Sequence, residues 1–211
     1  MARTRIKICG IRDAETALFA VESGADALGF VFAKTSPRYI EPVDAWEILQ
    51  MLPPFVTSVG LTVNLKSEQF DEIQEAAPFD LVQLHGSESI PQARDYMTPV
   101  IKAIRFDEAT ISEELGRWAR VDEVVAILVD GSAGGEGESF DWEKLAALRD
   151  EVVHPLILAG GLTPENVGEA IRIVRPYAVD VSSGVESERG TKDPARIRAF
   201  CAAVRAADGA G

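Results

Sequence analysis

Short apolar runs alternate with amphipathic segments along the whole chain. The runs are four to six residues long and rich in Val, Ile and Leu, which is typical of strands buried on both faces of a parallel sheet. Strict alternation of such strands with helices indicates an α/β fold. The predicted strands are Ile6–Cys9, Ala27–Phe32, Ser58–Val63, Leu81–Leu84, Val100–Ile104, Val125–Val129, Leu156–Ala159 and Ala178–Val181.

The amphipathic segments predict eight helices. Asp13 is suited to cap the first, which ends before Gly24, and Pro42 stands in the first turn of the second. The predicted helices are Asp13–Ser23, Pro42–Leu52, Glu68–Ala76, Ile90–Tyr96, Ile111–Ala119, Trp142–Arg149, Pro164–Val174 and Asp193–Ala207. Near-equal spacing of the eight units favours a single (β/α)8 TIM barrel over residues 1–211. An open doubly wound sheet is the alternative, because periodicity does not report closure.

Composition and charge exclude several classes of function. Hydrophobic residues make up 46% and charged residues 26% of the chain, as in an ordinary globular protein. No apolar run approaches the roughly 18 residues of a membrane span, and no signal-peptide pattern opens the chain, so we expect a cytoplasmic protein. The net charge of −13 disfavours nucleic acid and anionic membranes as partners. An anionic substrate would need local positive groups or backbone N–H donors.

Cysteine and histidine are too scarce for a metal centre. Cys9 and Cys201 cannot make a disulfide framework or a four-cysteine site. His85 and His154 lie far apart in the sequence and outside any HExxH pattern. We therefore expect no catalytic metal.

The first predicted strand ends in a candidate catalytic thiol. Chemistry in such barrels lies at the carboxyl ends of the strands. Alternation points Lys7 and Cys9 into the barrel and Ile6 and Ile8 outward. Cys9 is a candidate base or nucleophile; the alternative is a small buried hydrophobic residue.

Three further candidates follow other strands. Arg38, in a basic loop, suits a carboxylate or phosphate, or is simply a solvated arginine. His85 is an acid or base, or a hydrogen-bonded structural histidine, which is the favoured interpretation. Asp130 is a candidate general acid, or a turn or capping residue. The glycine-rich loop 134–139 after Asp130 could close over a ligand, or is a plain surface loop.

Glycine and serine clusters follow the last two predicted strands, where barrels of this kind often hold phosphate. Backbone N–H donors would bind the anion without adding formal charge. The candidates are Gly160, Gly161, Ser182, Ser183 and Gly184. Asp180 shares a strand face with Ser182. It contacts the substrate or neutralises Lys7, and the ion pair is the favoured interpretation.

Several of these segments, in this order over nearly the whole chain, resemble the phosphoribosylanthranilate isomerase family of tryptophan biosynthesis. They include Lys7-Ile8-Cys9-Gly10, Ser36-Pro37-Arg38, Gln83-Leu84-His85-Gly86, Ala159-Gly160-Gly161-Leu162 and Val179 to Glu186. The resemblance implies an Amadori rearrangement of N-(5-phosphoribosyl)anthranilate to 1-(2-carboxyphenylamino)-1-deoxyribulose 5-phosphate. It makes Asp130 the acid that opens the ribose ring and Cys9 the base at C2. Arg38 would hold the anthranilate carboxylate or stabilise developing charge, and the glycines and serines would surround the phosphate. The chemistry would be internal redox by proton transfer, so the resemblance implies no metal and no nicotinamide or other cofactor.

Two positions depart from the family pattern. Leu61-Thr62 stands where an aromatic residue is frequent, and Glu136 where a small hydroxyl residue is common.

Two other functions are alternatives to the one that the resemblance implies. The first is that of the sister isomerase of histidine biosynthesis, or of a dual-substrate enzyme. That reaction uses two aspartates, and here Cys9 occupies the first of the two positions. The second alternative is a non-catalytic phosphate-binding barrel. The sequence leaves open whether the protein is a monomer or a homodimer.

Overall fold

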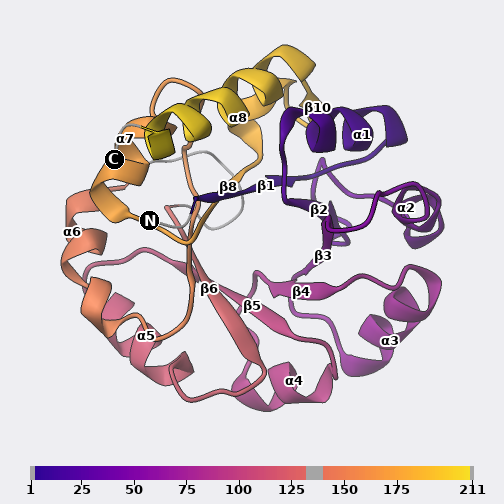
Figure 1. Cartoon of the computed structure of the whole chain (residues 1–211). Helices are drawn as coiled ribbons and strands as arrows, with labels where there is room; N and C mark the ends of the chain where they lie inside the picture. The colour runs from indigo at the N-terminus through magenta and orange to yellow at the C-terminus, as the bar shows by residue number, and fades with distance from the viewer. Residues whose placement is uncertain (1–2, 132–139, 210–211) are drawn as a thin grey trace.

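Eight parallel strands close into a barrel in sequential order, with β1 hydrogen-bonded to β8 (Figure 1). This computed structural model describes residues 3–131 and 140–209. The strands of the barrel are β1 (Arg5–Cys9), β2 (Ala27–Val31), β3 (Thr57–Thr62), β4 (Leu81–Leu84), β5 (Val100–Arg105), β6 (Val124–Asp130), β7 (Leu156–Leu158) and β8 (Ala178–Val181). Closure confirms the TIM barrel and excludes the open sheet.

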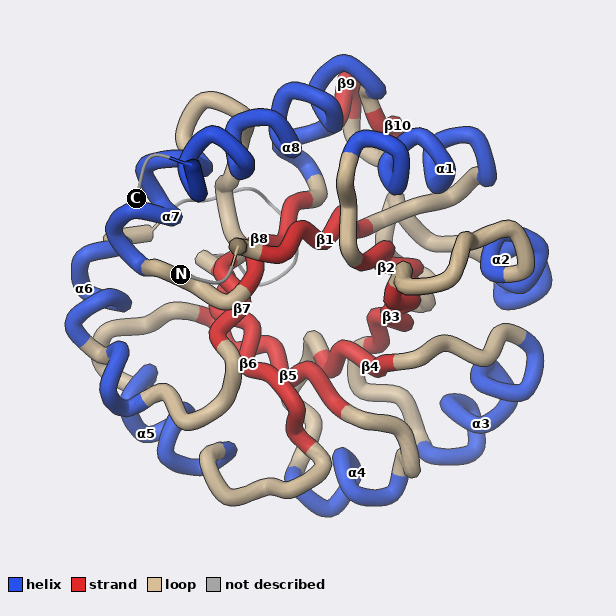
Figure 2. The backbone as a smooth tube through the Cα atoms, in the orientation of Figure 1, coloured by secondary structure: helices blue, strands red, loops and turns tan. Residues whose placement is uncertain are grey.

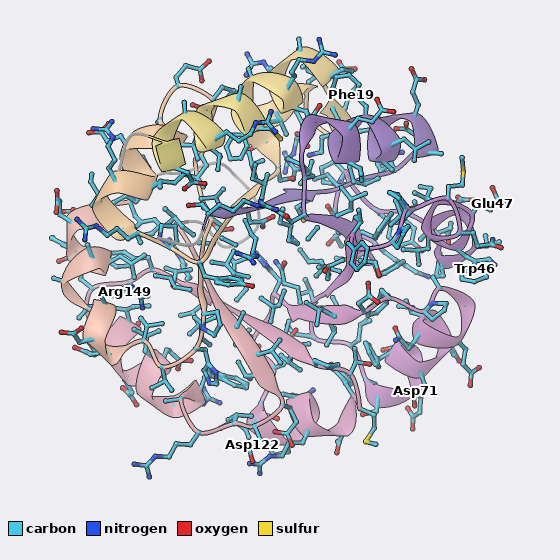
Figure 3. The ribbon with its side chains drawn as sticks, viewed as in Figure 1. Phe19, Trp46, Glu47, Asp71, Asp122 and Arg149 are labelled. Atoms are coloured by element: carbon cyan, nitrogen blue, oxygen red, sulfur yellow. The ribbon has the colours of Figure 1, made fainter. Side chains whose placement is uncertain are left out.

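A ring of helices surrounds the strands (Figure 2). In Figure 3, the labelled side chains Trp46, Asp71, Asp122 and Arg149 lie around the periphery of the molecule. The helices are α1 (Ala14–Ser23), α2 (Pro42–Leu49), α3 (Ser67–Ala76), α4 (Ile90–Asp95), α5 (Ile111–Trp118), α6 (Trp142–Ala147), α7 (Val167–Val174) and α8 (Pro194–Gly209), with 3-10 turns η1 (Arg149–Glu151) and η2 (Ser183–Val185). None of the helices in the described ranges is long and apolar enough to cross a membrane.

Helix boundaries follow local capping. Asp13 caps α1 by accepting from the Thr16 N–H at 2.7 Å, and Gly24 ends the helix with a φ of 107°. The prediction that a helix begins at Pro164 is wrong by three residues. The Asn166 side chain accepts from Thr163 N and donates to Gly161 O, which fixes a turn before α7 starts.

Alternate strand residues fill two separate cores. On β1, Ile6 and Ile8 belong to the large core between the barrel and the helices. Inside the barrel, apolar side chains such as Val59 and Leu128 pack together. The predicted alternation is therefore confirmed, and it directs Cys9 inward at the carboxyl end of β1.

A short antiparallel ribbon follows β8 and was not predicted. It pairs β9 (Glu186–Glu188) with β10 (Thr191–Lys192) around Gly190, whose φ is 89°. Strands of two and three residues are too short to give a periodic signal. The ribbon folds Glu186 and Lys192 back toward the carboxyl end of the barrel.

Candidate active site

Two adjoining cavities open at the carboxyl ends of the strands. The larger, of about 260 Å³, is lined by Cys9, Arg38, His85, Asp130, Asp180 and Ser182, among others. The smaller, of about 30 Å³, is lined by residues that include Gly160, Gly161 and Ser183. Asp130, Asp180 and Ser182 line both cavities. Nine of the ten predicted site residues therefore come together, and only Gly184 lines neither cavity.

Cys9 ends β1 with its thiol buried in the wall of the larger cavity. The next residue, Gly10, has a φ of 86°, which lets the chain turn away beside Arg38. Burial raises the pKa of the Cys9 thiol above its ordinary value. The positive charges of Lys7 and Lys192 oppose that rise, whereas Asp180 adds to it.

Lys7 and Asp180 form a buried ion pair inside the barrel. They lie opposite each other in the β1–β8 register, and Lys7 Nζ donates to Asp180 Oδ1 at 2.9 Å. Burial alone would lower the pKa of Lys7, but Asp180 and Cys9 raise it above its ordinary value. The favoured interpretation of Asp180 is thus confirmed. Because Asp180 also lines both cavities, the pair lies within reach of a ligand.

His85 is held between Gln83 and Asp130. The Gln83 amide nitrogen lies 2.9 Å from His85 Nδ1, and His85 Nε2 lies 3.9 Å from Asp130 Oδ2. An amide N–H donated to Nδ1 leaves the ring proton on Nε2, facing the carboxylate. Burial lowers the pKa of His85, which favours the neutral ring. This geometry suits an oriented hydrogen-bonding histidine.

Arg38 is engaged by a carboxylate of the protein itself. Its Nε and Nη2 donate to Glu186 Oε1 and Oε2 at 2.7 and 2.9 Å. Glu186 also accepts from Lys192 Nζ at 2.8 Å and from Gly190 N at 3.1 Å. Burial would raise the pKa of Glu186, but Arg38 and Lys192 hold it below its ordinary value. Binding of a substrate carboxylate by Arg38 stays a prediction. The two hydrogen bonds to Glu186 use Nε and Nη2 of the guanidinium and leave Nη1 for such a contact.

Glu186 and Lys192 are the site residues that the sequence analysis missed. Both are buried, and Lys192 Nζ also donates to the Ser182 carbonyl at 2.9 Å. The signal that could have found them is a pair of opposite charges flanking a glycine turn directly after the last strand. Arg189, between them, also lines the larger cavity.

The smaller cavity is walled by backbone that bends at glycines. Gly160 and Gly161 have φ values of 84° and 64°, a region that favours glycine. A β-carbon on Gly160 would lie 2.3 Å from Gly131 N and 2.9 Å from Asp130 Oδ1. A β-carbon on Gly184 would lie 1.9 Å from the Leu162 carbonyl oxygen, so the loop after β8 packs directly on the loop after β7.

A second buried ion pair fixes the loop after β4. Lys102 points outward from β5 and donates to Glu88 at 2.8 Å and to the Gly86 carbonyl at 2.7 Å. Glu88 in turn accepts from the N–H groups of Gly86 and Asn64. These bonds hold the backbone next to His85.

Of the two departures from the family pattern, the structure describes only the first. Leu61 lines the larger cavity, and Thr62 is buried beside it in β3. Glu136 and the predicted closing loop 134–139 lie outside the described residues.

Comparison with known proteins identifies the family. The model of the family described as N-(5'phosphoribosyl)anthranilate (PRA) isomerase matches residues 6–203. The chain belongs to this family. The predicted membership of the phosphoribosylanthranilate isomerases, enzymes that interconvert an aldose and a ketose in tryptophan biosynthesis, is therefore confirmed.

Similar proteins cover nearly the whole chain. An N-(5'-phosphoribosyl)anthranilate isomerase of Pseudomonas aeruginosa strain UCBPP-PA14 is 48% identical over 209 residues, 97% of each chain. A solved phosphoribosyl anthranilate isomerase in complex with reduced 1-(o-carboxyphenylamino)-1-deoxyribulose 5-phosphate has a TM-score of 0.85, 43% identity and coverage of 96% of this chain and 99% of its own. A structure of monomers generated from the dimeric Thermotoga maritima isomerase has a TM-score of 0.83 and 42% identity, with the same coverage.

Proposed function

We propose that this isomerase rearranges N-(5-phosphoribosyl)anthranilate to 1-(2-carboxyphenylamino)-1-deoxyribulose 5-phosphate, with Asp130 as general acid and Cys9 as general base. One observation carries the proposal. Cys9 and Asp130 line one cavity from β1 and β6, and Asp130 also lines the adjoining glycine-walled cavity. An acid and a base that share a cavity suit a reaction of two proton transfers on one sugar.

The chemistry begins at the ribose ring. Asp130 donates a proton to the ring oxygen as the C1–O bond breaks, which gives an open-chain Schiff base between C1 and the anthranilate nitrogen. Cys9, as thiolate, then removes the proton from C2 and leaves an enolamine. The enolamine gains a proton at C1 and loses one from the C2 hydroxyl, which gives the ketone. The aldose carbon is reduced and C2 is oxidised within one molecule, so the reaction needs no metal or nicotinamide.

The anionic groups of the substrate would be held at the two ends of the site. Gly160, Gly161, Ser182, Ser183 and Gly184 would offer backbone and hydroxyl donors to the phosphate. Arg38 would direct Nη1 at the anthranilate carboxylate. Backbone N–H groups bind an anion locally and add no formal charge. They therefore suit a chain whose net charge of −13 repels anions at long range.

His85 and Asp180 would contact the substrate without exchanging protons with it. A neutral His85 with its proton on Nε2 can donate a hydrogen bond to Asp130 or to a substrate oxygen near it. Asp180, bonded to Lys7, leaves its second carboxylate oxygen for a sugar hydroxyl. These contacts would orient the ribose between the acid and the base.

The experiment that tests the proposal follows the anthranilate-type fluorescence of freshly generated N-(5-phosphoribosyl)anthranilate mixed with the pure protein and EDTA. We expect a fast, protein-dependent decay to the rearranged product. Decay at only the background rate would refute the proposal. The histidine-pathway substrate is offered to the same preparation; turnover of both substrates would identify a dual enzyme, and turnover of that substrate alone would replace the proposed reaction.

We further infer a homodimer formed through the amino ends of the strands. Phe55 lies before β3 with a φ of 72° and a fully exposed ring. It borders a cavity of about 470 Å³ at the amino end of the barrel, which Arg5 and Tyr177 also line. An exposed aromatic ring on strained backbone suits burial against a second subunit. The description of the Thermotoga maritima relative as dimeric supports this inference.

We also infer that the whole chain, 1–211, is one domain that works in the cytoplasm without nucleic-acid or membrane partners. Helix α8 packs against both α7 and α1 and so joins the two ends of the ring. Both cysteines are buried and unpaired, as is usual in a reducing compartment.

A further inference from the structure

Lys7 is a charged residue in the interior of the barrel. Bulky apolar side chains usually fill such interiors, and here Val59 and Leu128 do so nearby. Lys7 is only 3% exposed and is bonded to Asp180. A buried ion pair loses hydration on folding and is often no more stabilising than an apolar pair of similar volume. Stability alone therefore does not account for this pair.

The Lys7 ammonium and the Cys9 thiol lie against the same glycine. Gly29, on the neighbouring strand β2, is opposite Cys9 in the register. A β-carbon on Gly29 would lie 2.8 Å from Cys9 Sγ and 3.1 Å from Lys7 Nζ. The two atoms are therefore no further apart than these distances together, and a unit charge acts strongly over such a separation in a buried site.

Charged groups from four segments act on the Cys9 thiol. Lys7 comes from β1, Asp180 from β8, Lys192 from β10 and Arg38 from the loop after β2. Lys192 and Arg38 both bind Glu186, which offsets their charge. Among the influences that lower the pKa of the thiol against burial, Lys7 is the largest.

We propose that Lys7 is a positioning residue for Cys9: its buried ammonium, anchored by Asp180, stabilises the thiolate that removes the C2 proton. The inference rests on the proposed role of Cys9 as the base. Lys7 keeps its own protons throughout, while the proton moves from C2 to Cys9 Sγ. When the thiolate is neutralised, Asp180 remains as the counter-charge for Lys7.

The test measures the ionisation of Cys9 without substrate. In a Cys201→Ala background Cys9 is the single thiol, and iodoacetamide can approach it through the larger cavity. The rate of alkylation as a function of pH gives the pKa of the thiol. In Lys7→Met we expect the midpoint to rise by about one pH unit and the rate at pH 7 to fall about tenfold. The acid limb of kcat/KM should move by the same amount.

The matched control is Lys102→Met. It breaks the other buried lysine–carboxylate pair, in the layer outside the barrel, and Lys102 is 4% exposed. We expect a lower free energy of unfolding and an unchanged alkylation midpoint. An unchanged midpoint in Lys7→Met, or an equal shift in Lys102→Met, would overturn the inference.

A double variant keeps the inference testable if Lys7→Met does not fold. Lys7→Met/Asp180→Asn leaves no buried unpaired carboxylate, and we expect its midpoint also to lie above that of the parent. A parental midpoint in this variant would overturn the inference. A shifted alkylation midpoint with an unmoved kcat/KM profile would support the effect of Lys7 on the thiol and refute the role of Cys9 as base.

Discussion

His85 Nε2 lies 3.9 Å from Asp130 Oδ2 across the carboxyl end of the barrel. Gln83, two residues earlier on the same chain segment as His85, fixes the ring from its other side. The carboxyl group at the end of β6 thus faces the imidazole of the residue that follows β4. A proton donor needs such fixed geometry, because general acid catalysis depends on the distance to the accepting atom.

Asp130→Asn should abolish most of the turnover while the barrel remains folded. The amide fills the same space but cannot protonate the ring oxygen. We expect kcat to fall by about 10²–10⁴-fold, the usual contribution of a general acid. Steady-state kinetics and circular dichroism check the two halves of the prediction. A variant with near-parental kcat would remove Asp130 from the mechanism.

Cys9→Ser should also lose about 10²–10⁴-fold in kcat. A serine hydroxyl is a far weaker acid than a thiol and does not form an anion near neutral pH. The control is Cys201→Ala, because Cys201 is buried in α8 on the outer side of the barrel. We expect that control to keep its turnover. If Cys9→Ser were as active as the control, another group would be the base.

Gly160→Ala should impair the site through its backbone. The residue has a φ of 84°, and a β-carbon would lie 2.9 Å from Asp130 Oδ1. We expect KM to rise and kcat to fall by at least tenfold, because both cavities meet at Asp130. Gly116→Ala in α5, where nothing lies within 4 Å of the new methyl group, is the control. It should keep full activity and gain up to about 1 kcal/mol in stability.

Glu186→Gln should change the pH dependence of stability. The pKa of Glu186 is depressed in the folded protein, so its contribution is complete above the ordinary glutamate pKa of about 4.3 and is lost as the pH falls through the lower folded value. We expect the variant to be about 3 kcal/mol less stable at neutral pH, because Arg38 and Lys192 lose their common counter-charge. Urea unfolding between pH 3 and 7 should show a shallower fall for the variant than for the parent.

The control for that series is Glu108→Gln, which removes one side of an exposed ion pair with Lys144. It should leave stability almost unchanged, since exposed pairs contribute little. Glu88, whose pKa Lys102 also depresses, should keep part of the acid sensitivity in both variants. Parallel stability curves for the parent and Glu186→Gln would contradict the prediction.

Phe55→Asp should dissociate the inferred homodimer. A carboxylate at this exposed position would be buried without a partner in the interface, whereas the carboxyl end of the barrel is untouched. We expect light scattering to report a dimer for the parent and a monomer for the variant, with kcat retained. Exposed Val43, away from this cavity, gives the control Val43→Asp, which should stay dimeric. A monomeric parent would refute the interface.

The barrel and most of the site could be predicted because they follow from local patterns. Alternation in Lys7-Ile8-Cys9 assigned each side chain to its face, and the carboxyl ends of the strands indicated where chemistry lies. The pairing of Arg38 with Glu186 could not be predicted, because it joins residues 148 positions apart through a ribbon without periodicity. The start of α7 was missed because the Asn166 side chain competes with helical hydrogen bonds in a way that spacing does not reveal.

Strand β1 lies between β2 and β8, so the seam where the first and last units of the chain meet runs beside Cys9. The same seam brings Asp180 to Lys7 and Ser182 to the Cys9 carbonyl. A chain whose final unit has not yet docked therefore lacks the contacts of Asp180 and Ser182 beside Cys9, the proposed base. Recovery of turnover during refolding should therefore require that β1 and β8 have paired, because Lys7 meets Asp180 only across that seam.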